Sequence, residues 1–63
     1  MKPPVTITVE LSADEAWAFA EYLKRVGITD YRRLALEVTE ADRMQRAGMC
    51  IARALAELGV APR

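Results

Sequence analysis

The side chains that most often carry catalysis are scarce in this sequence. Histidine is absent from the 63 residues, and Cys50 is the single cysteine. Without histidine the usual general base near neutral pH is missing, and so are the usual hydrolytic triads. Ser12 stands at the expected start of a helix, so we interpret it as a helix cap and not as a nucleophile. We therefore expect a protein that is not an enzyme and that holds no cofactor and no metal ion.

Positive charge clusters on the last expected helix, at Arg43, Arg46 and Arg53. One interpretation is a solvated face, because Asp42 and Glu57 lie within helical reach of Arg46 and Arg53. The other interpretation is a contact with an anion or with an acidic protein surface. We favour the solvated face and keep the three arginines as candidate partner-binding residues.

Cys50 falls near these arginines on a helical wheel and away from the main apolar stripe of its helix. Neighbouring cations raise the reactivity of a thiol, which would make Cys50 a redox site. A cysteine also fills a small apolar gap at an interface, and we favour this second interpretation.

Three large apolar residues, Trp17, Tyr22 and Met49, lie off the centres of the main stripes of their helices. A chain of this length has few residues left to bury a second apolar side of these helices. We therefore expect a subunit or partner interface around these residues. Gly48 lies inside the last helix, where it costs roughly 1 kcal/mol relative to alanine. We expect another helix or an aromatic ring to approach it closely.

The first element that positions these residues is an alternating run near the N-terminus. Its apolar residues share one side: Val5, Ile7, Val9 and Leu11. The polar residues between them share the other side: Thr6, Thr8 and Glu10. Such alternation predicts a half-buried strand. Because a lone strand leaves backbone N–H and C=O groups unpaired, we expect it to pair with the same strand of a second copy.

A helix is predicted directly after this run. Ser12 and Glu15 have the spacing of a capping box, in which each side chain accepts from a backbone N–H of the other. The apolar stripe then continues to Val26, and Gly27 is the expected C-cap.

Two further helical patterns follow. Thr29 or Asp30 can cap a helix from Tyr31 to about Val38, although residues 34–38 also alternate and could form a strand. Residues 40–58 carry the cleanest helical stripe, so this helix should be the longest, and it should end at Gly59.

The expected fold class is therefore α+β and mostly helical, with one N-terminal strand followed by two or three helices. We expect a single domain over residues 1–63, with a flexible arm at residues 1–4 and a tail at residues 60–63. A chain of this size buries only about 60% of its unfolded surface, which favours a homodimer with the strand paired across it. The alternative is a monomer in which residues 34–38 form a strand parallel to the first, with the helix 13–26 as the crossover.

Charge and hydropathy limit the partners. Nine basic and nine acidic residues cancel, and the sequence pI of about 6.2 gives no general attraction to nucleic acid or to anionic membranes. The apolar runs are far shorter than a membrane span or a signal peptide core. We expect a cytoplasmic protein with no membrane contact.

In the order of its elements, the chain resembles a ribbon-helix-helix protein over residues 5–38. The signature is a short alternating strand, a helix, and Gly27-Ile28-Thr29 leading into a second helix. In that family two chains pair their strands into a ribbon that enters the DNA major groove, and the second helix binds a phosphate at its N-terminus. The resemblance implies that Thr6, Thr8 and Glu10 read bases and that Thr29 contacts a phosphate. The chain departs from the family because no lysine or arginine lies on the ribbon.

Residues 9–17, 23–27 and 54–59, with the ending Ala61-Pro62-Arg63, are similar to a family of small uncharacterised proteins from bacterial mobile elements and phages. That resemblance spans almost the whole chain and implies an accessory role. Our expectation is a homodimeric, non-enzymatic, protein-binding accessory or inhibitory protein. The alternative is a ribbon-helix-helix transcriptional regulator or antitoxin.

Overall fold

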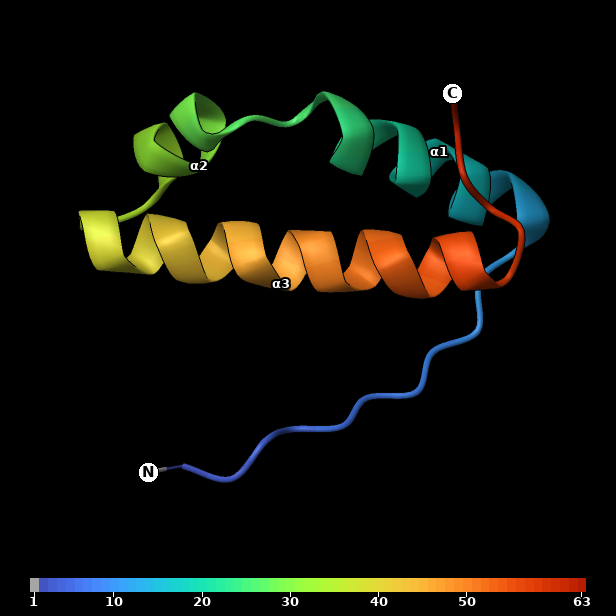
Figure 1. Cartoon of the computed structure of the whole chain (residues 1–63), viewed down its shortest axis with the longest axis horizontal. Helices are drawn as coiled ribbons and strands as arrows, with labels where there is room; N and C mark the ends of the chain where they lie inside the picture. Colours follow the sequence, from blue (N-terminus) through green and yellow to red (C-terminus); the bar gives the residue numbers. More distant parts are fainter. Residues whose placement is uncertain (1) are drawn as a thin grey trace.

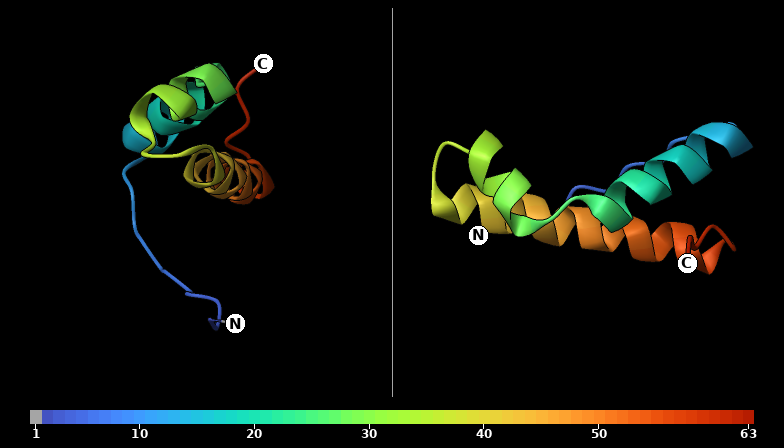
Figure 2. Two further views of the ribbon diagram at one scale, coloured as in Figure 1. Left: turned by 90° about the vertical axis from the view of Figure 1, so that its left-hand side faces the viewer. Right: turned by 90° about the horizontal axis from the view of Figure 1, so that it is seen from above.

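Three helices make up the body of the protein. The computed structural model describes residues 2–63, in which α1 spans Ala13–Arg25, α2 spans Ile28–Leu34 and α3 spans Val38–Glu57 (Figure 1). Both shorter helices pack on α3. Figures 1 and 2 show α1 and α3 running in opposite directions, with α2 over the first half of α3. No helix within the described residues combines the length and the apolarity needed to cross a membrane.

The predicted N-terminal strand is wrong, and the fold is all-α rather than α+β. Residues 2–11, which we call the N-terminal segment, are extended and project away from the helices (Figures 1 and 2). No strand is formed within residues 2–63, and no backbone hydrogen bond joins the N-terminal segment to another described residue. Period-two alternation predicted a half-buried strand here, but these residues form no regular element and all of them are exposed. A strand also needs a partner edge, and the three helices offer none.

The helix α1 begins where its capping box predicts. The Ser12 N–H donates to Glu15 Oε1 at 3.0 Å, and the Glu15 N–H donates to Ser12 Oγ at 3.1 Å. The helix ends at Arg25 with Val26 as its cap, slightly before the expected closure at Gly27. Arg25, the last residue of the helix, forms an ion pair of 3.0 Å with Glu21.

The helix α2 is earlier and shorter than predicted. It begins at Ile28, because the Asp30 side chain reaches back to accept the N–H of Gly27 at 2.9 Å. It ends at Leu34, and residues 35–37 form a bend rather than either the helix or the strand considered for residues 34–38. The alternative monomer with two parallel strands is therefore also wrong.

The helix α3 is the longest, as predicted, with 20 residues. It ends at Glu57 with Leu58 as its cap, slightly before the expected end at Gly59, and Gly59 has a φ of 89°, in the left-handed region that glycine tolerates. The Val60 N–H then donates to the Leu55 carbonyl, and the Gly59 N–H donates to the Ala56 carbonyl, both as in a Schellman motif. This cap folds Val60 back toward the end of α3.

The interior is small. Its only buried apolar side chains among the described residues are Ala20 and Ala41, and Gly48 is buried with them. The Tyr31 ring covers Gly48, as we expected for an aromatic ring, with Tyr31 Cζ 3.4 Å from the place that a Cβ on Gly48 would occupy. The radius of gyration is 12.8 Å. A compact domain of this length would have about 10.6 Å.

Candidate functional site

An apolar groove lies between the N-terminal segment, α1 and the end of α3. Its volume is about 710 Å³, and its lining is mostly apolar, with Thr8 and Glu15 as its polar members. Its larger side chains are Ile7, Val9, Leu11, Phe19, Leu55 and Leu58. We call this the apolar groove. The side chains of its rim are open to solvent, with Ile7 69% exposed and Leu58 82% exposed.

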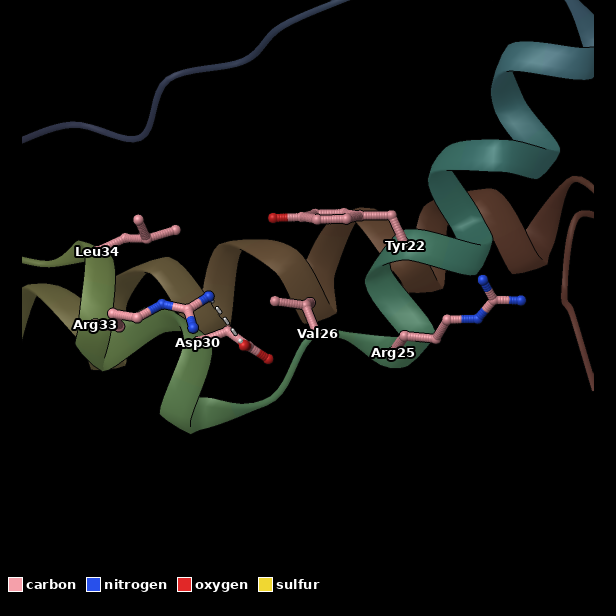
Figure 3. Close-up of a pocket in the computed structure, with 6 residues that line it drawn as sticks. All are labelled: Tyr22, Arg25, Val26, Asp30, Arg33 and Leu34. Carbon is pink, nitrogen blue, oxygen red and sulfur yellow. Dashed lines mark hydrogen bonds and ion pairs between the residues drawn. The ribbon is translucent and has the colours of Figure 1, made fainter.

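A smaller pocket of about 290 Å³ lies where α1 meets α2. Figure 3 shows the Tyr22 ring and Leu34 reaching toward each other across it, with Val26 between them. Arg33 and Asp30 form an ion pair of 3.5 Å on one side. Arg25 points away from the pocket toward its own partner, Glu21. The pocket is therefore mostly apolar, and the charged side chains nearest to it already form ion pairs.

The rings of Phe19 and Tyr22 connect the apolar groove with the smaller pocket between α1 and α2. Their centroids are 5.5 Å apart and their planes differ by 20°, which is a stacked arrangement. Phe19 lines the apolar groove, whereas Tyr22 lines the pocket between α1 and α2. One flank of α1 is therefore apolar from the groove to the pocket.

Trp17 and Met49 lie on the other side of the molecule. A residue two positions along a helix is turned by about 200°. Trp17 is two positions from Phe19 on α1, and Met49 is two positions from Ile51 on α3, while both Phe19 and Ile51 line the apolar groove. Both side chains therefore face away from the groove, and both are exposed. Of the three predicted aromatic and methionine residues, Tyr22 alone lies on the groove side.

Two of the three predicted arginines share a face of α3 with Met49. Arg46 and Arg53 are seven positions apart, which turns them by only about 20°, and Met49 lies between them. Arg43 is turned from Arg46 by about 60°. We use the name Trp17–Met49 face for Trp17, Met49, Arg46 and Arg53, each of which is exposed on the side of its helix turned away from the groove.

These arginines are exposed, and their expected partners do not neutralise them. Within residues 2–63 the ion pairs are Arg25 with Glu21 and Arg33 with Asp30. The predicted pairing of Asp42 with Arg46 is therefore not formed, and neither is a pair of Glu57 with Arg53. Cys50 is exposed on the same outer side of α3.

The residues assigned to DNA reading do not form one surface. Thr6, Thr8 and Glu10 are exposed on the N-terminal segment, and Thr8 also lines the apolar groove. Thr29 is exposed in the first turn of α2. The neighbouring Asp30 carboxylate already accepts the free N–H of Gly27 there. This helix end thus carries the chain's own negative charge.

Sequence reasoning missed an exposed apolar strip at the bend between α2 and α3. Leu34, Leu36 and Val38 are all exposed, with Leu36 at 92%. The alternating pattern placed these residues in a regular element with one covered side. No such element forms, because Glu40 Oε1 accepts the N–H of Leu36 at 2.9 Å and starts α3 at Val38. The N-cap residue of α3, Glu37, makes no side-chain capping hydrogen bond, so no capping motif in the sequence marked this helix start.

One ionisable group departs clearly from its ordinary behaviour. The hydrogen bonds that Glu15 accepts from the backbone and side chain of Ser12 hold the pKa of its carboxyl below the ordinary value of 4.5. No group of three His, Cys, Asp or Glu side chains that could hold a metal ion occurs in the part of the chain that the structure describes.

The comparisons with known proteins place the chain in a family but assign it no activity. Comparison with the curated proteins and with the solved structures gave no match. A family model matches the whole chain, residues 1–63. The chain therefore belongs to the Family of unknown function (DUF7706).

Proposed function

We propose that the protein is a non-enzymatic, homodimeric protein of the cytoplasm that acts by binding another protein, as an accessory or inhibitor. The observation that carries this proposal is the surface of the single chain. Its accessible area is 5668 Å² at a mass of 7.0 kDa. Monomeric proteins of this mass expose about 4,040 Å². A single copy therefore leaves its largest apolar side chains uncovered.

The excess area supports self-association. It amounts to about 1,600 Å² per chain, whereas a standard interface buries about 800 Å² per partner. With a formal net charge of zero, two identical copies do not repel each other. Burying apolar area contributes about 25 cal/mol per Å², so the missing core is the largest source of stability still available to the chain.

The Trp17–Met49 face supports a second, different partner. It combines an aromatic ring and a thioether with two arginines that have no ion pair within residues 2–63. Tryptophan, methionine and arginine are enriched at protein interfaces. The matching surface would present carboxylates around an apolar patch. The resemblance to proteins of mobile elements and phages suggests that this partner belongs to a complex of the host or of the element.

The alternative of a DNA-binding ribbon-helix-helix regulator has less support. The helix end that would bind a phosphate is occupied by the carboxylate of Asp30, which would repel it. Glu10 adds a second negative charge on the segment that would read bases. We therefore do not adopt this alternative.

The first test is the solution molar mass by light scattering on a sizing column, over a dilution series. We expect a species of twice the 7.0 kDa chain mass that dissociates on dilution. A species of a single chain mass at every concentration would contradict the homodimer.

The second test concerns the partner protein. Affinity capture is compared between the wild type and the Trp17→Ala, Arg46→Glu and Arg32→Glu variants. Arg32 is an exposed arginine on α2, outside the Trp17–Met49 face, and serves as the control for charge reversal. We expect proteins that the wild type and Arg32→Glu retain and that the other two variants lose. Equal retention by all four proteins would contradict the assigned face.

A further inference from the structure

We propose that a second copy of this chain occupies the apolar groove, with the apolar side chains of its N-terminal segment. The two copies would thereby build one shared core. This inference rests on the proposed homodimer and names the surface that forms it.

The first argument is that the groove is incomplete within one chain. Ile7 and Val9 line it, yet they remain 69% and 70% exposed. The N-terminal segment therefore forms a wall of the groove without filling it. Leu58, on the opposite wall at the end of α3, is also exposed. Apolar walls of this size left facing water are the usual mark of an interface.

The second argument is the reach of the N-terminal segment. Its ten residues can span about 33 to 36 Å when fully extended. The longest dimension of the whole molecule is 33 Å. The segment is therefore long enough to cross a second copy from one end of its helices to the other. Its extended form already projects from the helices in Figures 1 and 2.

The third argument is closure. In a two-fold dimer both copies use the same surface. Each contact that the first copy makes with the second is therefore repeated by the second copy with the first. Each copy carries both a groove and a segment, so two reciprocal contacts of segment with groove about a two-fold axis would cover both grooves. The assembly stops at two, and the Trp17–Met49 face stays free because it lies on the side of the helices away from the groove.

The area agrees with this arrangement. Covering the excess of about 1,600 Å² on each chain would give a total interface of about 3,200 Å². Obligate homodimers bury between roughly 2,000 and 5,000 Å². A weak contact between two domains that each fold alone would bury a much smaller area.

The test compares substitutions on the two sides of the N-terminal segment. In a single chain both Ile7 and Thr6 are exposed, so lysine at either position disrupts no buried contact within one chain. We expect Ile7→Lys to give the mass of one chain, or to weaken dimerisation at least about 100-fold. We expect Thr6→Lys, whose side chain does not line the groove, to keep the wild-type dimer.

A labelling experiment guards against loss of folding in the lysine variant. In a Cys50→Ser background, single cysteines replace Val9, Leu58 or Thr6, and their maleimide labelling is followed above and below the dimer dissociation constant. We expect cysteines at positions 9 and 58 to react at least about tenfold more slowly in the dimer, with no protection at position 6. Equal rates at all three positions would overturn the inference.

The outcomes separate this inference from the proposed function. A wild type that is a monomer at all concentrations contradicts the homodimer itself. A wild-type dimer that survives Ile7→Lys, and that leaves positions 9 and 58 open to the reagent, contradicts only the role of the groove.

Discussion

At the scale of single residues, the contact between Gly48 and Tyr31 decides how closely α2 approaches α3. A Cβ at Gly48 would overlap the Tyr31 hydroxyl, while Tyr31 Cζ and Leu23 Cδ2 would remain at ordinary contact distances of 3.4 and 3.5 Å. Helix propensity alone favours alanine over glycine by about 1 kcal/mol. The ring is rigid and held by α2, so steric overlap opposes that gain.

We predict that Gly48→Ala destabilises the protein, because overpacking typically costs about 1–3 kcal/mol and exceeds the helix-propensity gain. Tyr31→Phe removes the atom that clashes, so the double variant should recover most of the loss. Urea unfolding of the two single variants and the double variant, at one protein concentration, measures the coupling. A Gly48→Ala protein that is more stable than the wild type would show that α2 moves aside without cost.

The location of the candidate binding residues could be predicted only in part. The seven-residue spacing of Arg46 and Arg53 was enough to predict their common side of α3, whereas Arg43, which we grouped with them, is turned from Arg46 by about 60°. Trp17 and Tyr22 were grouped together because both lie off the main stripe of α1. They are five positions apart, which is about 140° around the helix, so they lie on different flanks.

At the scale of elements, local signals predicted α1 and α3 well. Ser12 with Glu15 and the glycine at position 59 act within one turn of the helix end, so no tertiary information was needed. The start of α2 was missed because Asp30 caps backward, onto Gly27. The N-terminal strand was wrong because alternation describes the sides of a segment and says nothing about the partner edge that would make it a strand.

The capping box of α1 makes stability depend on pH. The pKa of Glu15 is lowered in the folded state, chiefly by the backbone hydrogen bond from Ser12. The Glu15 carboxylate therefore stabilises the folded state fully at pH values above its pKa in the unfolded chain. This stabilisation is lost as the pH falls through the lower pKa that Glu15 has in the folded state. We predict that Glu15→Gln, which keeps a capping-box side chain, removes this part of the acid dependence.

The measurement is thermal unfolding of both proteins at a series of pH values from neutral to strongly acidic, at a fixed concentration. The wild type should lose its advantage over the glutamine variant across the range below 4.5. Parallel pH profiles for the two proteins would show that the Glu15 carboxylate contributes nothing through its charge.

At the scale of the whole molecule, the small interior predicts how unfolding responds to concentration. A single chain buries only Ala20 and Ala41 among its apolar side chains, within the described residues. If the two copies share a core, folding and association become one equilibrium. We predict that the Tm rises with each tenfold increase in protein concentration and that no folded monomer precedes unfolding. Calorimetry over a range of concentrations tests this, and a Tm independent of concentration would show that one chain folds alone.

If the two copies share a core, the small interior also makes the amount of active protein depend on the rate of its synthesis. When a chain gains its core only by pairing with a second copy, the folded dimer forms by a second-order process. Near the dissociation constant, halving gene expression therefore reduces the dimer concentration by more than half. Unpaired chains would expose their apolar side chains and their backbone to proteases and would be removed. Expression level would then act as a threshold, below which the protein disappears and above which it accumulates.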